Sequence, residues 1–388
     1  MHFCVEGLDI VIVGGGIGGL TTAVALGRDG HRVTVLDQAV ELRPTGAGIS
    51  LWSNGVKVLN ALGLGPAIAA VGGLLEGVTY LDRSGAPLCD FSLQPLVERV
   101  GQRPYPVRRS DLQTLLLDAA GRDNIRLGQR AVAVDDDDER ATVTTATGDR
   151  FSGDLVVVAD GTHSRLRDHV IGQAVPREYV GYHNWNGIVP DGLGKPDAWT
   201  VFLGEAKRVS TMPVRDGHYF FFDVPLEHPE IDATRAPKDV LADHFGWWAE
   251  PVRRLIDQID ESATANVSIH SHQPIDRFAR GRVALLGDAA HTTAPDLGQG
   301  GCQAMEDALV LAHYLRTTNV SVADALRRYS DERVPRTDAI VRRATERARL
   351  SHGHDLALTE AWYRELATED GSNIIDGICK SIETGPCR

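Results

Sequence analysis

Three glycines near the amino terminus have the spacing of a phosphate-binding turn. They form the run Gly14-x-Gly16-x-x-Gly19, and an acidic residue, Asp37, follows roughly 20 residues later. Glycines permit a tight turn and a close approach of the backbone to a pyrophosphate, and the helix that follows points its positive end at the phosphates. The acid then accepts a hydrogen bond from a ribose hydroxyl. The run therefore predicts dinucleotide binding without separating FAD from NAD, and the alternative is a glycine-rich turn that serves only packing.

Two later motifs could complete such a site. Asp160-Gly161 directly follows one apolar run, and Gly287-Asp288 follows another. Pro295 and then Gly298-Gln299-Gly300-Gly301 come shortly after the second motif. Each motif alone is compatible with an ordinary strand-to-loop turn, so the combination in this order is what indicates a function.

The elements around these motifs predict an α/β fold. Asp9–Val13 and Arg32–Leu36 are β-branched runs typical of buried parallel strands, and Leu20–Arg28 between them has a helical pattern. This order requires the right-handed crossover of a parallel sheet. Further strands are predicted at 154–160 and 282–288, and further helices at 110–120, where Ser110 caps the helix, at 303–315 and at 321–350.

The middle of the chain has a different pattern. From about 179 to 272, short aromatic runs such as His218–Asp223 predict an antiparallel sheet, and Trp247-Trp248 is expected to fill its core. The acidic run Asp135–Arg140 is expected to be a solvated hairpin tip. We therefore expect a discontinuous first domain into which the aromatic sheet is inserted.

The composition excludes several classes of protein. Of 388 residues, 43% are hydrophobic and 24% charged, which excludes a disordered or collagen-like chain, and the net charge of −13 argues against nucleic acid as a general partner. No apolar run reaches the roughly 18 residues of a membrane helix, and no signal peptide is visible. Five scattered cysteines without a C-x-x-C predict neither a disulfide framework nor a zinc site. We expect a reduced, cytoplasmic protein, either a monomer or a homodimer.

Together the motifs resemble those of the group A flavoprotein aromatic hydroxylases, over essentially the whole chain. The resemblance implies a glutathione-reductase-type FAD-binding domain with an inserted antiparallel β-sheet substrate domain and C-terminal helices. It places the FAD-binding domain at 1–72, 105–175 and 274–350, the substrate domain at 73–104 and 176–273, and a helical tail covering the FAD-binding domain at 351–388. FAD is then tightly bound, while NADH visits briefly, because no second nucleotide-binding domain is visible. The implied cofactor-binding residues are Gly14, Gly16, Gly18, Gly19, Asp37, Gln38, Ser50, Arg109, Ala131, Asp160, Asp288, Gly298, Gln299, Gly300, Gly301 and Cys302.

Stretches outside the cofactor motifs are similar to the bacterial FAD-dependent urate hydroxylases. These stretches are 49–57, 184–187, 204–210, 220–225, 293–302 and 358–363. The similarity implies that urate is hydroxylated at C5 to 5-hydroxyisourate with NADH and O2, through a flavin C4a-hydroperoxide. The implied substrate-binding residues are Asn184, Arg208 and Tyr219, and the implied catalytic residues are Arg208 and its partner Asp296 beside the flavin.

The chemistry of these residues suits a planar anion. A guanidinium such as that of Arg208 makes paired charge-assisted hydrogen bonds, and the amide of Asn184 both donates and accepts. Without the resemblance, Arg208 would be interpreted as a surface arginine. Tyr219 keeps a structural alternative even with the resemblance, as one aromatic residue of an apolar strand. Three alternatives stay open: a related hydroxylase of another small aromatic acid, an NAD-dependent dehydrogenase, and a non-catalytic flavin-binding sensor.

Several further residues have a functional and a structural interpretation. The segment Pro295–Gly301 opens a helix whose positive end is expected to face the flavin. Cys302 is either a reactive thiol or a small packing residue. His291 is expected to be a buried structural histidine, and His352-Gly353-His354 a loop. No metal site is predicted, because His270 and His272 lack an apparent third ligand.

Overall fold

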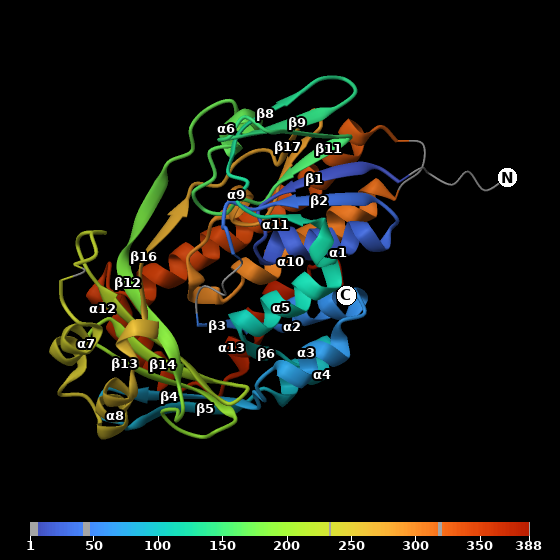
Figure 1. Ribbon diagram of the computed structural model, residues 1–388. Helices are drawn as coiled ribbons and strands as arrows, with labels where there is room; N and C mark the ends of the chain where they lie inside the picture. Colours follow the sequence, from blue (N-terminus) through green and yellow to red (C-terminus); the bar gives the residue numbers. More distant parts are fainter. Residues whose placement is uncertain (1–6, 42–46, 233, 317–319, 388) are drawn as a thin grey trace.

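The computed structural model describes residues 7–41, 47–232, 234–316 and 320–387 of the chain. Cys4, one of the five cysteines, lies outside these residues. Two sheets lie at opposite ends of the molecule, with the helices α10 (Gly300–Leu315) and α11 (Val322–Ser351) between them (Figure 1). Within the described residues, no helix is long and apolar enough to cross a membrane.

The first sheet has six strands and contains the glycine-rich turn. Its order is β17-β18-β11-β1-β2-β7, and all neighbours are parallel except β17 and β18. Apart from Asp9, the residues of the central strands β1 and β11 are apolar and buried, as a sheet covered on both faces requires. The strands are β1 (Asp9–Val13), β2 (Arg32–Leu36), β7 (Ile125–Arg126), β11 (Leu155–Val158), β17 (Ala279–Arg280) and β18 (Val283–Leu285).

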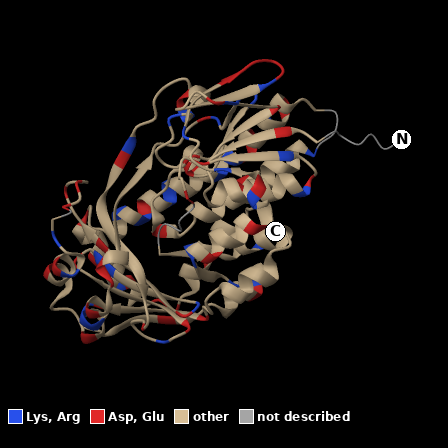
Figure 2. Ribbon diagram, viewed as in Figure 1, with Lys and Arg blue, Asp and Glu red and all other residues tan. Residues whose placement is uncertain are grey.

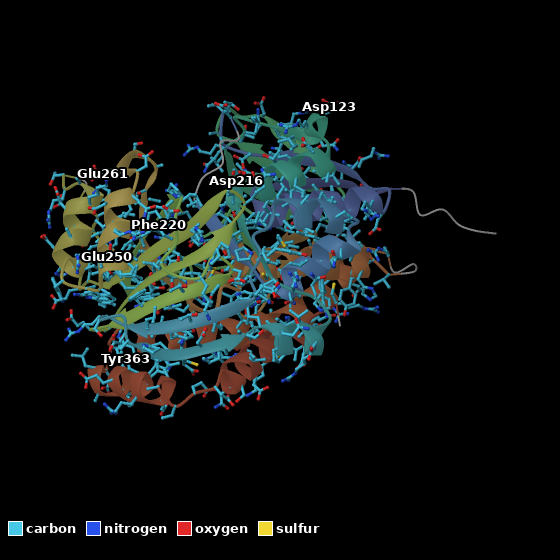
Figure 3. All side chains as sticks on the ribbon, turned by 90° about the horizontal axis from the view of Figure 1, so that it is seen from below. Asp123, Asp216, Phe220, Glu250, Glu261 and Tyr363 are labelled. Atoms are coloured by element: carbon cyan, nitrogen blue, oxygen red, sulfur yellow. The ribbon has the colours of Figure 1, made fainter. Side chains whose placement is uncertain are left out.

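The second sheet has seven strands in the order β16-β12-β15-β14-β13-β4-β5. Along β15 the side chains alternate, so that Phe220 and Phe222 pack against α7 (Pro237–Phe245) and α8 (Glu250–Gln258) in a separate core (Figure 3). Tyr219, Phe221 and Asp223 therefore lie on the opposite face. The strands are β4 (Gly77–Asp82), β5 (Pro87–Ser92), β12 (Arg177–Val189), β13 (Ala198–Gly204), β14 (Lys207–Val214), β15 (Gly217–Pro225) and β16 (Ala265–His272).

Two small sheets and the other helices complete the fold. The small sheets are β3 (Gly48–Leu51) with β6 (Tyr105–Arg108), and β8 (Ala131–Asp136), β9 (Ala141–Thr145) and β10 (Arg150–Gly153). The residues between β8 and β9 form an exposed tip (Figure 2), but Asp135 and Asp136 of the predicted tip belong to β8, where Asp136 Oδ1 lies 3.0 Å from His169 Nε2. The other helices are α1 (Ile17–Arg28), α2 (Ser53–Ala61), α3 (Gly65–Val71), α4 (Gln94–Val100), α5 (Arg109–Ala120), α6 (Arg167–Ile171), α9 (Asp288–His291), α12 (Leu356–Leu366) and α13 (Ser372–Ile382).

The structure confirms the predicted fold class and corrects four details. The large sheet is not purely antiparallel, because β4 joins β13 in parallel. Ser110 is not a cap: α5 begins at Arg109 without any side-chain cap. Of the two tryptophans expected to fill the core, only Trp248 is buried. Trp247 is 57% exposed, and Lys207 Nζ lies 5.2 Å from the centre of its ring.

The fourth correction concerns the C-terminal tail. We expected it to cover the FAD-binding domain, but α13 packs on α4 as well as on α11. Arg99 of α4 forms ion pairs with Asp376 and Glu383, while Arg343 of α11 donates to Ser381 Oγ over 3.0 Å. The tail therefore bridges segments that we had assigned to both domains.

Candidate active site

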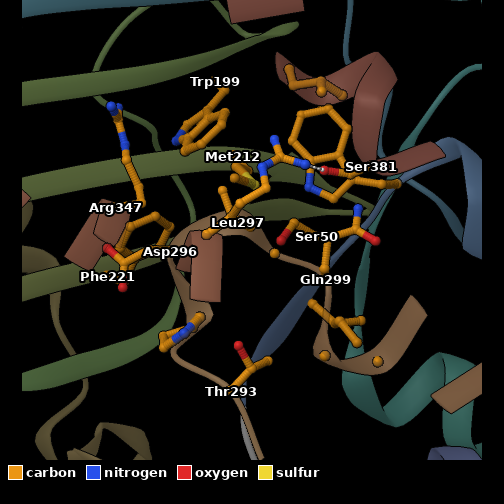
Figure 4. Close-up of a pocket in the computed structure, with 18 of the residues that line it drawn as sticks. Ser50, Trp199, Met212, Phe221, Thr293, Asp296, Leu297, Gln299, Arg347 and Ser381 are labelled. Atoms are coloured by element: carbon orange, nitrogen blue, oxygen red, sulfur yellow. Dashed lines mark hydrogen bonds between the residues drawn. The ribbon is translucent and has the colours of Figure 1, made fainter. Parts of the chain in front are cut away.

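A cavity of about 980 Å³ lies between the two sheets. Its walls combine the glycine-rich turn after β1, the segment from Gly287 to Gly301, the inner face of the large sheet and the C-terminal helices. Figure 4 shows Phe221, Asp296 and Arg347 on one side of the cavity, and Ser50 and Gln299 on the other. The volume suits a ligand larger than a single ring system.

Three polar residues form a row across the inner face of the large sheet. Asp223 of β15 is directly opposite Asn184 of β12 on one side and Arg208 of β14 on the other. Arg208 Nε donates to Asp223 Oδ2 over 2.6 Å, and Asn184 Nδ2 donates to Asp223 Oδ1 over 2.7 Å. All three side chains are at least nine-tenths buried. The row fixes the guanidinium plane of Arg208 at the cavity wall.

Asp296 joins this row to two more elements. It lies in the short 3-10 helix Pro295–Leu297, and its Oδ1 is 3.4 Å from Arg208 Nη2 and 3.1 Å from His352 Nε2. Tyr182 donates its hydroxyl to Asp296 Oδ2 over 2.6 Å and stacks on the His352 ring at 3.9 Å between centroids. The predicted pairing of Asp296 with Arg208 is therefore present, as the longer of the two carboxylate contacts of Arg208.

The cluster keeps its charged forms. Burial alone raises the pKa of Asp296, but His352 and Arg208 outweigh it and lower the pKa to about 2. Burial works against the charge of Arg208 too, yet Asp223 and Asp296 together raise its pKa. Arg208 is consequently a permanent, oriented cation at neutral pH.

Aromatic side chains form the rest of this wall. Tyr219 lines the cavity, and within the described residues its hydroxyl has no hydrogen-bond partner. Burial raises its pKa, so the hydroxyl stays protonated. Phe221 lies 5.1 Å from the Arg208 guanidinium, and Trp199, Tyr80 and Met212 complete the surface. A flat ligand could contact these rings while its polar edge meets Arg208.

The glycine-rich turn fits the pyrophosphate of FAD. Gly14 has φ of +108°, and a Cβ there would lie 2.2 Å from the Ala159 carbonyl oxygen, so a side chain is excluded. A Cβ on Gly16 would have no atom within 4 Å, which leaves the backbone open to a ligand. The first turn of α1 has no side-chain cap, so its amides are available to phosphate oxygens.

The ribose and ribityl positions also fit. Asp37 Oδ2 accepts a hydrogen bond from the Gly15 amide over 2.7 Å, which holds the carboxylate beside the turn. Asp160 Oδ1 is buried without a partner among the described residues, and burial raises its pKa. Asp288 is exposed toward the cavity at the start of α9. These acceptors suit the hydroxyl-rich chain of FAD.

The loop before α10 completes this end of the cavity. Gly298 has φ of +62°, and a Cβ there would lie 2.6 Å from Trp52 Nε1. The helix begins at Gly300, earlier than the predicted Gln303, and no side chain caps it. Its positive end, at Gly300 and Gly301, therefore lines the cavity.

A buried polar network holds α10 in place. His291 Nε2 lies 2.6 Å from Asp307 Oδ2, which confirms the predicted structural role of this histidine. Arg333 of α11 pairs with Asp307 over 2.6 Å and with Glu306 over 3.0 Å. Cys302 is fully buried beside this network, and burial raises its pKa to about 12, which favours the packing interpretation over a reactive thiol.

The structure brings most of the expected residues to one cavity. Those lining it are Gly16, Gly18, Ser50, Arg109, Asn184, Arg208, Tyr219, Asp288, Asp296, Gly298, Gln299, Gly300 and Gly301. Gly14, Gly19, Asp37, Gln38, Ala131, Asp160 and Cys302 do not line it. Asp37 lies beside the turn because its carboxylate accepts from the Gly15 amide, and its carbonyl accepts from the amide of Gln129, two residues before Ala131. Sequence reasoning missed Asp223, Tyr182, His352 and Arg347.

Comparisons with known proteins agree with this arrangement. A model of the FAD binding domain family matches residues 7–344. The FAD-dependent urate hydroxylase of Klebsiella pneumoniae subsp. pneumoniae is 47% identical over 383 residues, covering 98% of this chain and all of that protein. The FAD-dependent urate hydroxylase of Mycolicibacterium vanbaalenii is 44% identical over 385 residues, covering 98% of each. The solved structure of Klebsiella pneumoniae HpxO with FAD and uric acid matches with a TM-score of 0.96 at 44% identity, over 100% of both chains.

Proposed function

The chain belongs to the family of the FAD-dependent urate hydroxylases, among the proteins with this FAD binding domain, and on this basis we propose that urate is its substrate, NADH its reductant and C5 of the purine the position that is hydroxylated. The proposed reaction consumes urate, NADH, a proton and O2. It yields 5-hydroxyisourate, NAD⁺ and water. When bound, FAD supplies the redox chemistry that activates O2.

One observation carries this proposal: Arg208 is buried, is held by two carboxylates and faces a cavity that also adjoins the Gly298–Gly301 loop. A fixed guanidinium can hold the ionised edge of urate in one orientation relative to that loop. The ionised purine is the electron-rich form that an electrophilic oxygen attacks. Arg208 and Asp296 thereby act as the proposed catalytic residues.

Asn184 and Tyr219 are the other proposed substrate contacts. The Asn184 oxygen accepts from Asn186, so one N–H and one lone pair remain for an amide-like edge of the ligand. The Tyr219 hydroxyl can donate to a purine oxygen or nitrogen. With FAD bound, the positive end of α10 at Gly300 and Gly301 would stabilise negative charge on the cofactor.

The domain division and the compartment are proposals too. The first sheet with α10 and α11 would form the FAD-binding domain, and the large sheet the substrate domain. The four described cysteines are unpaired thiols, which agrees with a reducing compartment, and we propose the cytoplasm.

The test is aerobic NADH oxidation by the purified holoenzyme with and without urate, with urate loss and peroxide followed together. We expect urate to stimulate NADH oxidation, one urate to disappear per NADH, and little peroxide to form. If urate stays intact while peroxide accumulates, the proposal fails. A panel of small aromatic acids then tests the related hydroxylase alternative.

A further inference from the structure

The charged groups around Arg208 supply no excess of positive charge for an anionic ligand. Two buried carboxylates, Asp223 and Asp296, face a single guanidinium. With a proton on His352, the positive charges of Arg208 and His352 equal the negative charges of Asp223 and Asp296, and the net charge of the cluster is zero. The cluster therefore offers an anionic substrate oriented hydrogen-bond donors, but no excess positive charge to neutralise the negative charge of that substrate.

A second guanidinium of the same cavity is uncompensated. Arg347 of α11 lines the cavity, and within the described residues no group accepts a hydrogen bond from it or forms an ion pair with it. Glu346 and Glu365 also line the cavity, but neither pairs with Arg347. Arg343, one turn earlier, differs because it already donates to Ser381 Oγ and the Gly377 carbonyl oxygen.

The position of Arg347 is fixed by an aromatic ring. Its Cζ lies 4.0 Å from the centre of the Trp362 ring, which belongs to α12 and is itself buried. A guanidinium stacked in this way keeps the N–H groups of its edge free for a planar anion. Figure 4 shows Arg347 on the side of the cavity where Phe221 and Asp296 lie.

Arg347 lines the same cavity as Arg208 and lies on the side of Phe221, whose ring centre is 5.1 Å from the Arg208 guanidinium. Burial lowers the pKa of Arg347, and the charge of Arg208 lowers it further, while Tyr80 and Asp296 act in the opposite direction. The guanidinium remains charged at neutral pH, since arginine does not lose its proton in proteins. An anion bound between Arg347 and Arg208 would relieve this repulsion.

We propose that Arg347, stacked on Trp362, is a second anion-binding residue of the cavity, which supplies the positive charge that draws the urate anion in and holds it beside Arg208. This inference rests on the proposed function, because it takes urate as the ligand. It assigns a role in substrate binding to the C-terminal helices α11 and α12.

The test compares Arg347→Gln with Arg349→Gln in the holoenzyme. Arg349 lies two residues further along α11, is exposed and does not line the cavity, so it controls for a change of net charge. Calorimetric titration with urate in the absence of NADH gives Kd directly. Loss of a charge-assisted contact predicts that Arg347→Gln raises the Kd and KM for urate about tenfold to hundredfold. Arg349→Gln should leave both unchanged.

Two further measurements keep the result specific. The wild-type Kd should rise with salt, and this dependence should weaken in Arg347→Gln. Arg347→Lys, which keeps the charge but loses the planar fork, should bind urate with an intermediate Kd. Equal Kd values for wild type and Arg347→Gln, in protein of unchanged melting temperature and FAD content, overturn the proposal.

A failure of the proposed function can be distinguished from a failure of the role proposed for Arg347. Wild-type protein that does not consume urate refutes that function, whatever Arg347 does. The same titrations with 4-hydroxybenzoate, a planar monoanion, then decide about Arg347. Weaker binding to Arg347→Gln than to wild type supports an anion site, whereas equal binding, or no binding of either anion to wild type, overturns it.

Discussion

Arg208 Nε lies 2.6 Å from Asp223 Oδ2, closer than the 3.4 Å that separates Arg208 Nη2 from Asp296 Oδ1. The two residues are directly opposite each other on β14 and β15, so the sheet register itself sets their pairing. Asp223 is fully buried and also accepts from Asn184. This carboxylate therefore orients two of the proposed substrate contacts, Arg208 and Asn184, at once.

Asp223→Asn is expected to weaken urate binding and to destabilise the protein. The amide cannot accept as strongly from both Arg208 and Asn184, so the guanidinium loses its fixed plane. We expect KM for urate to rise about tenfold or more, with a stability loss of about 3 kcal/mol from the broken buried pair. Steady-state kinetics and chemical denaturation measure the two effects. Asp216→Asn, at the exposed β14–β15 turn, is the matched control, and a KM equal to wild type in Asp223→Asn would contradict this role.

His352→Gln should impair the coupling of NADH oxidation to urate loss. The substitution removes the stacking on Tyr182 and changes the donor to Asp296, which leaves Arg208 less constrained. We expect more peroxide per NADH than in wild type, at unchanged FAD content. His354→Gln controls for the loop, since His354 contacts the Val180 carbonyl instead. Peroxide yields that match wild type would show that His352 has only a structural role.

Acid pH should destabilise the protein through His272. Its Nε2 accepts from the Thr292 amide over 3.1 Å, and burial lowers its pKa from 6.5 to about 4. Between these values the unfolded chain binds a proton that the folded state does not, so stability falls as pH drops from about 6.5 to about 4. The group accounts for about 2 kcal/mol between pH 7 and pH 5. Denaturation of wild type and His272→Gln at both pH values measures the difference, and equal pH dependence would refute the assignment.

The first sheet and the motifs that follow its strands could be predicted from sequence, because the evidence for them is local. The run Asp9–Val13 with its glycines is a strand, turn and helix unit whose geometry depends on neighbouring residues. The parallel pairing of β4 with β13 could not be predicted, because more than 100 residues separate the two strands in the sequence. Such long-range pairing has no periodic pattern that identifies the partner.

In the candidate site, too, some residues could be predicted from the sequence and others could not. Arg208, Asn184 and Asp296 were expected because the family resemblance covers their positions, whereas Asp223 was missed although it is an acid at the end of an apolar run. Its polarity among Phe220, Phe221 and Phe222 was an available signal, since a buried carboxylate requires a partner. His352 and Arg347 had no such signal. Arg347 reaches the cavity only because α11 passes between the two sheets, and His352, which directly follows that helix, contacts Asp296 instead.

The most direct test of the account measures urate loss and peroxide per NADH in Arg208→Gln, with wild type and Arg208→Lys beside it. Glutamine removes the fixed cation that orients the urate anion, and lysine keeps a point charge without the planar fork. We expect Arg208→Gln to retain FAD and oxidise NADH, but to convert less than about a tenth as much urate per NADH as wild type, with the balance released as peroxide. Arg208→Lys should fall between the two. Full coupling in Arg208→Gln would contradict the claim that the buried Arg208 holds the substrate for hydroxylation.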